Sequence, residues 1–262
     1  MLAPFHDTPA RCAVLTDFDG TLSAIVDEPS AARPLPGVGD LLERLASRFA
    51  VAAVVSGRPV AFLDHLLPRS VLISGLYGLE QSHRGVRTDR EGASVWREVI
   101  DDVATASESV GPPGMGVERK GLSLTLHYRV RPDLAEAVQD WARRQAGRSG
   151  LVLRPAKMSV ELHPPFAVDK GTIAEALAAG LDAICFVGDD VGDLPAFDAL
   201  DRLATAGVHG VRVGVRSSEV SSEILERADV VVDGPEGAYD FLGSLLGDAD
   251  SVLGTLTPRT GG

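Results

Sequence analysis

Short apolar runs recur along the chain, and segments with a helical repeat of apolar residues separate many of them. A continuous apolar run is typical of a strand that is covered on both faces, whereas apolar residues three or four apart indicate a helix. We expect such strands at residues 13–16, 49–55, 71–73, 182–187, 211–215 and 229–232. We expect helices at residues 37–48, 59–67, 169–179 and 195–200. Repeated strand–helix units predict an α/β fold with a parallel sheet.

The middle of the chain has a different pattern, because apolar and polar residues alternate there. We expect strands at residues 116–129, 151–154 and 158–163 and helices at residues 93–109 and 132–148. Strands that are polar on one side are typical of an antiparallel sheet with one face exposed or facing a ligand. A charged, turn-rich stretch at residues 84–92 reads as a linker. We therefore predict a smaller α/β domain at residues 85–164, inserted in a core domain of residues 1–84 and 165–262.

The charge balance restricts the partners. The chain has 262 residues, 45% of them hydrophobic, and a formal net charge of −12. A uniform acidic excess disfavours nucleic acid and anionic membranes as partners. It does not exclude an anionic substrate, because local cations can override the total.

The remaining features of the chain indicate a cytoplasmic protein. No apolar stretch reaches the ~18 residues of a membrane span. Residues 1–11 contain Pro, His and Asp where a signal peptide needs a continuous apolar run. Cys12 and Cys185 lie in or beside apolar runs and are expected to be buried free thiols. Residues 248–262 are expected to form a frayed tail.

Two carboxylates follow the first predicted strand, at Asp17 and Asp19. Side chains two residues apart in an extended chain point to the same side, so both are expected to face one small volume. Close carboxylates repel unless a cation lies between them, and Mg²⁺ suits such oxygen ligands. Gly20 permits a sharp turn, and Thr21 offers a hydroxyl and an amide to an anion. One carboxylate could attack phosphorus while the other handles a proton; a solvated acidic turn is the alternative for this pair alone.

Polar groups follow other predicted strands as well. Ser56 ends the second strand, Asp189 and Asp190 end a later one, and Lys170 begins a helix. Ligands of parallel sheets bind beyond the carboxyl ends of the strands, so these groups are expected to converge on a phosphate and Mg²⁺. Each residue alone has another explanation: a strand-end cap for Ser56, surface charge for Lys170, an N-cap pair for the aspartates.

The order of these motifs resembles the haloacid dehalogenase superfamily of phosphohydrolases. The matching segments are D-F-D-G-T-L at 17–22, S-G-R at 56–58, Lys170 and G-D-D-V-G-D at 188–193. The resemblance implies a Rossmann-like core with a parallel sheet and an inserted α/β cap. It implies a nucleophile and metal ligand at Asp17, and an acid/base at Asp19 that ligates through its carbonyl. Further metal and phosphate contacts are implied at Asp189, with Asp190 and Asp193 around it, and at Thr21, Ser56, Gly57, Arg58 and Lys170.

Within that superfamily, residues 11–243 resemble the trehalose-6-phosphate phosphatases most. The match includes E-R-K-G-L-S-L-T-L-H-Y-R at 118–129 and K-M-S-V-E at 157–161. The resemblance implies Mg²⁺-dependent hydrolysis of trehalose 6-phosphate through an aspartyl-phosphate, in trehalose biosynthesis, with the synthase of the same pathway as a possible partner. Sugar contacts are implied at Lys157 and Glu161, with Lys120, His127 and Arg129 as neighbours. A surface ion pair and a solvated strand face are the alternatives for these residues.

The chain also departs from the family pattern. Tyr77 stands where the family often has His, and Gly192 and Leu194 replace a Thr and a Glu. These departures leave open a phosphatase for another sugar phosphate, such as sucrose phosphate or a mannosylglycerate phosphate. A catalytically inactive sugar-phosphate sensor is the alternative of another class. The intact set of Asp17, Asp19, Lys170 and Asp189 argues against the sensor.

Overall fold

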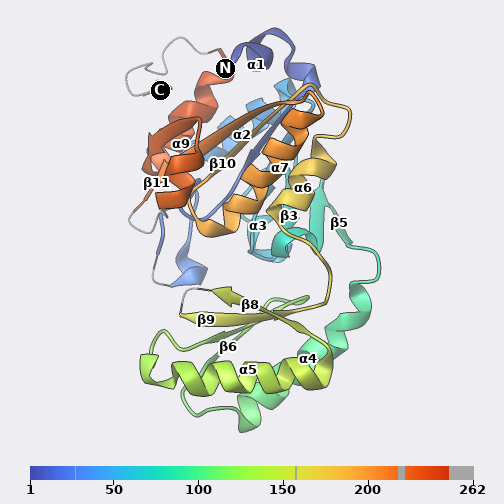
Figure 1. The fold of residues 1–262 in the computed structure, drawn as a ribbon, viewed down its shortest axis with the longest axis vertical. Helices are drawn as coiled ribbons and strands as arrows, with labels where there is room; N and C mark the ends of the chain where they lie inside the picture. The colour runs from blue at the N-terminus through green and yellow to red at the C-terminus, as the bar shows by residue number, and fades with distance from the viewer. Residues whose placement is uncertain (27, 157, 218–221, 248–262) are drawn as a thin grey trace. The chain divides into compact units, whose positions relative to one another are not determined.

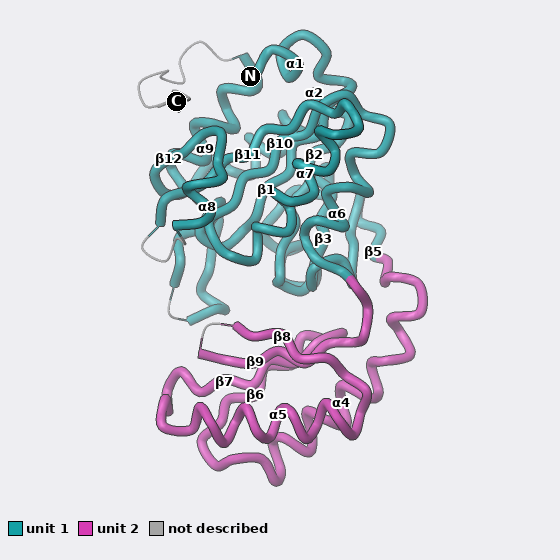
Figure 2. The backbone as a smooth tube through the Cα atoms, in the orientation of Figure 1, with its two compact units in different colours: residues 1–87, 168–262 teal, residues 88–167 magenta. Residues whose placement is uncertain are grey.

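The computed structural model describes residues 1–26, 28–156, 158–217 and 222–247. Contacts within the chain divide it into two compact units, coloured separately in Figure 2. The first unit comprises residues 1–87 and 168–262, and the second comprises residues 88–167. The expected tail at 248–262 lies outside the described residues. Among the described residues, none of the helices combines the length and the apolar character that crossing a bilayer requires.

The first unit is built on an eight-stranded sheet with the order β12-β11-β10-β1-β2-β3-β4-β5 (Figure 1). Its strands are β1 (Cys12–Thr16), β2 (Val51–Val55), β3 (Leu72–Gly75), β4 (Glu80–His83), β5 (Val86–Asp89), β10 (Ala183–Gly188), β11 (His209–Arg216) and β12 (Val230–Asp233). The pairs from β12 to β3 are parallel, and β4 is antiparallel to β3. All residues of the central strands β1 and β10 are buried, as a sheet covered on both faces requires.

Helices cover both faces of this sheet. They are α1 (Ala3–Asp7), α2 (Val38–Arg48), α3 (Val60–Leu63), α6 (Lys170–Leu177), α7 (Leu194–Thr205), α8 (Ser222–Arg227) and α9 (Gly234–Ser244). Successive side chains of a strand point to opposite faces. Accordingly Val14 and Cys185 pack with α2 and α9, whereas Leu15 and Phe186 pack with α6 and α7. The predicted parallel α/β core is therefore confirmed.

The edge of the sheet differs from the sequence-based expectation. Residues 84–92 were expected to form a linker, yet β5 lies within that range, next to β4. Every residue of β5 is exposed, and β4 has only one buried residue, Ser82. An edge strand with two solvated faces carries no apolar pattern, so periodicity could not find it. The helix expected at 59–67 is shorter, ending at Leu63.

The second unit has a four-stranded antiparallel sheet with the order β6-β7-β9-β8. Its elements are β6 (Gly116–Arg119), β7 (Leu124–His127), β8 (Val152–Ala156), β9 (Ser159–His163), α4 (Arg97–Val110) and α5 (Ala135–Ser149). Leu124, Leu126, Val160 and Leu162 pack against residues of both helices in one apolar core. The intervening residues of β7 and β9 are polar, so the other face of this sheet is polar, as the alternating pattern predicts.

Candidate active site at the carboxyl ends of the parallel strands

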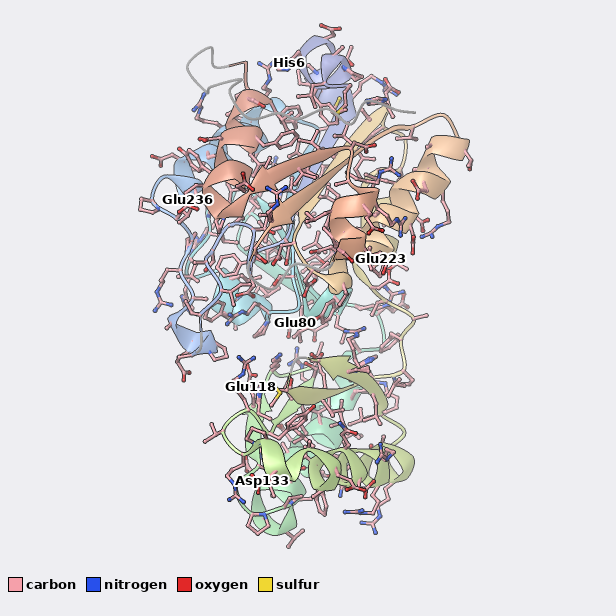
Figure 3. All side chains as sticks on the ribbon, turned by 60° about the vertical axis from the view of Figure 1, so that its left-hand side comes forward. His6, Glu80, Glu118, Asp133, Glu223 and Glu236 are labelled. Atoms are coloured by element: carbon pink, nitrogen blue, oxygen red, sulfur yellow. The ribbon has the colours of Figure 1, made fainter. Side chains whose placement is uncertain are left out.

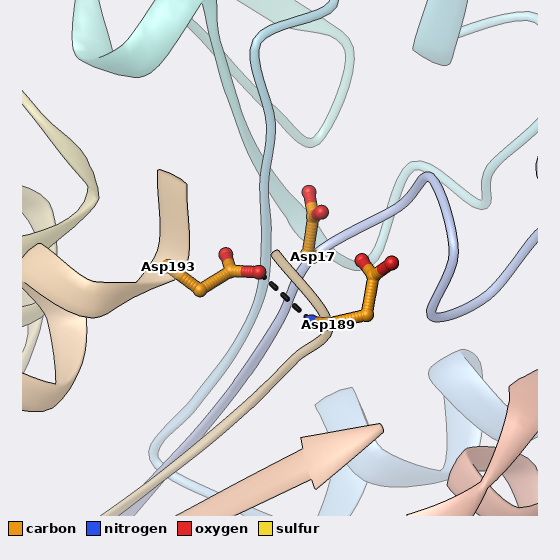
Figure 4. Close-up of side chains that lie close together, drawn as sticks. All are labelled: Asp17, Asp189 and Asp193. Carbon is orange, nitrogen blue, oxygen red and sulfur yellow. Dashed lines mark hydrogen bonds between the residues drawn. The ribbon is translucent and has the colours of Figure 1, made fainter. Parts of the chain in front are cut away.

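Three buried carboxylates meet beyond the carboxyl ends of β1 and β10 (Figure 4). Asp17 follows β1, Asp189 follows β10, and Asp193 ends a 3₁₀ turn at Val191–Asp193. One carboxylate oxygen from each lies within 4.8 Å of the others. Parallel pairing of β1 with β10, continued by a 2.9 Å hydrogen bond from the Asp17 N–H to the Val187 carbonyl, places these residues side by side.

Lys170 supplies the cation that holds this cluster together. Its Nζ lies 2.9 Å from Asp17 Oδ1 and 2.6 Å from Asp193 Oδ1, and all three side chains are buried. Lys170 is the first residue of α6, and Asp169 caps that helix by accepting a hydrogen bond from the Thr172 N–H at 2.8 Å. The cap fixes the start of α6 and thereby the position of the ammonium group.

Burial and charge together determine the protonation of these groups. Burial, opposed by Lys170 and reinforced by the neighbouring carboxylates, raises the pKa of Asp17 well above its usual value. Burial, followed by the charges of Asp193 and Asp190, raises the pKa of Asp189 to about 7. For Lys170 burial lowers the pKa, but the facing carboxylates of Asp17 and Asp193 outweigh it and leave the pKa well above its usual value. The ammonium therefore stays charged.

The donor set of this cluster fits a hard divalent cation. Three buried carboxylates face a single ammonium, so the cluster carries more negative than positive charge when ionised. Asp193 is already engaged: its Oδ1 accepts from Lys170, and its Oδ2 accepts from the N–H groups of Asp189 and Asp190 at 2.9 and 3.1 Å. Asp17 and Asp189 are thus the carboxylates best able to hold Mg²⁺, which prefers oxygen ligands.

Gly20 is required beside this cluster. Its φ is +74°, and a Cβ atom there would lie 2.1 Å from Asp189 Oδ2. No other residue fits without moving the Asp189 carboxylate, and the left-handed backbone also favours glycine. The sequence-based prediction of a sharp turn at Gly20 agrees with this conformation.

Asp19 does not join the carboxylate cluster, although the two-residue spacing predicted that it would face the same volume as Asp17. β1 ends at Thr16, so the strand periodicity no longer applies at Asp19. The Asp19 carboxylate instead accepts two hydrogen bonds from Arg58, at 2.8 Å from Nε and 2.7 Å from Nη2. Arg58, expected to bind phosphate, is therefore paired with a carboxylate in this structure.

The other predicted phosphate ligands lie in the turns after β1 and β2. Ser56 is buried, and its Oγ accepts the Arg58 N–H at 3.1 Å. The Thr21 hydroxyl is buried without a hydrogen-bond partner among the described residues. A buried hydroxyl without a partner costs free energy, so an anion at this position would relieve it. A Cβ at Gly57 would lie 2.6 Å from the Tyr77 hydroxyl, so this turn fits tightly against Tyr77.

Tyr77, which departs from the family pattern, lies in a strained turn. Leu76 has a φ of 49° and Tyr77 a φ of 57°, values that non-glycine residues rarely adopt. Their N–H groups donate to the carbonyls of Arg58 and Ser56 at 3.0 and 3.1 Å, which ties the turn to the Ser56–Arg58 segment. Of the other departures, Gly192 donates its N–H to Asp190 Oδ1 at 2.8 Å, and Leu194 begins α7.

Of the predicted sugar contacts in the second unit, Glu161 lies on β9 and Lys120 lies beside it. Glu161 is buried, its Oε2 lies 3.7 Å from Lys120 Nζ, and its Oε1 has no hydrogen-bond partner among the described residues. His127 Nε2 lies 2.8 Å from Glu118 Oε2. Arg129 lies beyond the end of β7 at His127, although strand was expected to extend to residue 129. Lys157 lies outside the described residues.

Glu118 is the member of this polar group that the sequence analysis missed (Figure 3). It contacts His127 and lies 3.9 Å from Lys120, measured from Oε2 to Nζ. The signal was available, because Glu118 opens the segment E-R-K-G-L-S-L-T-L-H-Y-R at 118–129 that carries the family resemblance.

The parallel sheet and the second unit together have the fold of solved haloacid dehalogenase-like structures. A haloacid dehalogenase-like hydrolase from Bacteroides thetaiotaomicron has the same fold, with a TM-score of 0.59 and 14% identity over 89% of this chain and 98% of that one. The C. albicans trehalose-6-phosphate phosphatase C-terminal domain has a TM-score of 0.72 and 25% identity, over 94% of this chain and 95% of that one.

The chain belongs to the trehalose-phosphatase family, whose model matches residues 15–231. The trehalose-phosphate phosphatase of Mycobacterium leprae is 33% identical over an alignment of 229 positions that covers 81% of this chain and 52% of that protein. The Mycobacterium ulcerans protein of the same name is 32% identical over 263 residues, or 95% and 64% of the two chains. The chain thus spans between half and two thirds of these relatives. The predicted family is confirmed.

The buried Lys170 cluster generates a prediction about stability. Without metal, Lys170→Met should lower the free energy of unfolding by about 3–5 kcal/mol, because it leaves buried carboxylates without their cation. Urea denaturation followed by circular dichroism measures this loss. Arg202→Met is the control, since the Arg202–Glu175 pair is exposed and should leave the midpoint nearly unchanged. Equal midpoints for Lys170→Met and the unaltered chain would contradict the stabilising role.

Proposed function

We propose that this chain hydrolyses trehalose 6-phosphate to trehalose and phosphate, as a step of trehalose biosynthesis. The observation that carries the proposal is the buried Asp17 carboxylate, held by Lys170 beside Asp189 at the carboxyl ends of the parallel strands. Membership of the trehalose-phosphatase family supports the substrate. The names of the mycobacterial relatives give further support.

The reaction proceeds in two steps through an aspartyl-phosphate. In the first step an Asp17 oxygen attacks phosphorus, the bond from phosphorus to the sugar oxygen breaks, and Asp19 gives its proton to that oxygen. In the second step water attacks the phosphorus, Asp19 takes a proton from the water, and the bond to Asp17 breaks. Inorganic phosphate is released, and Asp17 and Asp19 return to their initial states.

The phosphate is held by Lys170, Ser56, Thr21 and the amide of Gly57. Lys170 is a charged donor next to Asp17, and the buried Thr21 hydroxyl has a free donor among the described residues. Asp17 and Asp189, with the Asp19 carbonyl, hold Mg²⁺, while Asp190 and Asp193 surround them. When bound, the ion neutralises the charge of the phosphoryl oxygens.

The sugar is selected by the second unit, which serves as the cap. Phosphate ligands cannot distinguish one phosphate ester from another, so discrimination requires groups that pair with sugar hydroxyls. Glu161 is buried with an oxygen that lacks a partner among the described residues, and Lys120 lies beside it. His127, Arg129 and Lys157 complete the proposed sugar contacts. We place the enzyme in the cytoplasm, with the synthase that makes its substrate as a partner.

The first prediction concerns the nucleophile. Asp17→Asn should lower phosphate release by at least about 1,000-fold, because an amide cannot form the aspartyl-phosphate. Release of inorganic phosphate from trehalose 6-phosphate measures the effect, and circular dichroism checks the fold. Asp240→Asn, an exposed residue on α9, is the control and should keep full activity. Substantial turnover by folded Asp17→Asn would overturn the assignment of the nucleophile.

The second prediction concerns the metal. Activity should vanish with excess EDTA and return with Mg²⁺, because the carboxylates would otherwise repel a phosphate dianion. Mg²⁺ should also raise the thermal unfolding midpoint, since a ligand at 100 times its Kd stabilises a protein by about 2.7 kcal/mol. Asp189→Asn should reduce that shift. Full activity in excess chelator would rule out the metal requirement.

The third prediction concerns the sugar. Glu161→Ala should lower kcat/KM for trehalose 6-phosphate about 10–1,000-fold, because one or two hydrogen bonds of about 1.5–3 kcal/mol each are lost. Hydrolysis of 4-nitrophenyl phosphate should change less than about twofold, since that substrate has no sugar. Glu136→Ala, an exposed residue on α5, is the matched control. Equal losses of kcat/KM on both substrates would mean that Glu161 supports the fold or the chemistry. A wild-type enzyme that prefers sucrose phosphate would contradict the assignment of trehalose 6-phosphate as substrate.

A further inference from the structure

Arg58 uses its guanidinium group on two neighbours. Both oxygens of the Asp19 carboxylate accept hydrogen bonds from it, at 2.8 Å from Nε and 2.7 Å from Nη2. The remaining nitrogen, Nη1, donates to the carbonyl of Pro29 at 2.5 Å. All three nitrogens therefore have acceptors within the protein. A bidentate pair of this kind fixes the direction of the carboxylate as well as its distance.

Aromatic rings hold this pair in place. The guanidinium lies over the Phe62 ring, 4.5 Å from its centroid. Phe62 packs edge-on against Phe18, with ring centroids 6.2 Å apart. Phe18 is buried and stands between Asp17 and Asp19 in the chain. The segment that carries both carboxylates is thus connected to Arg58 twice, once through the ion pair and once through the two rings.

The two carboxylates consequently have different cations. Asp17 contacts Lys170 and is buried, whereas Asp19 contacts Arg58 and its side chain is 38% exposed. Asp19, held by this bidentate contact, is not a member of the cluster of Asp17, Asp189 and Asp193. A nucleophile and a proton donor must not compete for the same place, and these separate contacts keep them apart.

We propose that Arg58 is a positioning residue that orients Asp19 for proton transfer and does not bind the phosphate, an inference that rests on the proposed function. In the first step Asp19 must reach the sugar oxygen as the bond from that oxygen to phosphorus breaks and the bond from Asp17 to phosphorus forms. General acid catalysis contributes about 10²–10⁴-fold, and it depends on the placement of the donor. Three of the five N–H groups of Arg58 already donate to Asp19 and Pro29, and both oxygens of the Asp19 carboxylate are among their acceptors.

Two substrates with different leaving groups test this role. For a reaction with a covalent intermediate, kcat/KM reports only the steps up to release of the alcohol, so it isolates the first proton transfer. Arg58→Met should lower kcat/KM for trehalose 6-phosphate about 10–100-fold, because a sugar oxygen leaves poorly without a proton. It should change kcat/KM for 4-nitrophenyl phosphate less than about threefold, since nitrophenolate leaves without one. The inhibition constant of inorganic phosphate should stay within about twofold.

Asp19→Asn should show the same dependence on the leaving group. The double variant Asp19→Asn with Arg58→Met should then have the same kcat/KM for trehalose 6-phosphate as Asp19→Asn alone. If Arg58 acts only through Asp19, the effects of the two substitutions are not additive. Additive losses would overturn the proposal. Equal losses on both substrates, with a raised inhibition constant for phosphate, would also overturn it and make Arg58 a phosphate ligand.

Two further variants complete the design. Arg33→Met removes a guanidinium that contacts the carbonyls of Ser30 and Ala32, in the loop that also contains Pro29. This variant should leave kcat/KM unchanged for both trehalose 6-phosphate and 4-nitrophenyl phosphate. Arg58→Lys keeps the charge but cannot form the bidentate pair. If Arg58→Met fails to fold, Arg58→Lys takes its place in the comparison of kcat/KM on the two substrates.

The failure of this inference can be told from the failure of the proposed function. A wild-type enzyme that ignores trehalose 6-phosphate but hydrolyses another sugar phosphate refutes only the substrate, and the ratio is then measured on that sugar phosphate. A wild-type enzyme without activity on any phosphate ester overturns both. If the Arg58→Met enzyme is active but its kcat/KM falls by the same factor on both substrates, only the inference about Arg58 is overturned.

Discussion

The contact between the buried Lys170 ammonium and the carboxylates of Asp17 and Asp193 is the interaction on which the rest of the structure depends. A charge removed from water is tolerated only when paired at close range. Asp17 must therefore follow β1, Asp193 must follow β10, and α6 must begin beside them. β1 and β10 are neighbours in the sheet, and Thr16 is paired with Val187. The residues that follow the two strands therefore begin side by side, which satisfies this requirement.

The parts of this arrangement that follow from general rules could be predicted from the sequence. Continuous apolar runs identify β1 and β10, and ligands bind beyond the carboxyl ends of parallel strands, which brings Asp17, Asp189 and Lys170 together. The pairing of Asp19 with Arg58 could not be predicted, because 39 positions separate them and the turn at Gly20 determines where Asp19 points. Periodicity describes a strand and says nothing about the residue after its end.

The other differences between the predicted and the observed structure also come from the limits of sequence periodicity. The edge strands β4 and β5 carry polar residues on both sides, so their sequence does not differ from that of a loop. Arg129 lies just beyond the end of β7, although the predicted strand included it, and like Asp19 it follows the last residue of the strand. For Asp19 and Arg129 the alternation was extended past the hydrogen-bonded ladder that produces it. Strand ends are where ligands bind in parallel sheets, so this error concentrates at functional positions.

The charge of the site constrains the proposed function further. Asp17, Asp189 and Asp193 face one ammonium, and the chain as a whole has a net charge of −12. A phosphate dianion entering this cluster would meet like charge in a buried setting, where screening by salt is weak. The Arg58 guanidinium is engaged by Asp19, with 2.7 Å between Nη2 and Oδ1. Lys170 is shared between two carboxylates, so the negative charge that a phosphate meets would be reduced further by protons on Asp17 and Asp189, whose pKa values are raised, or by the proposed divalent cation.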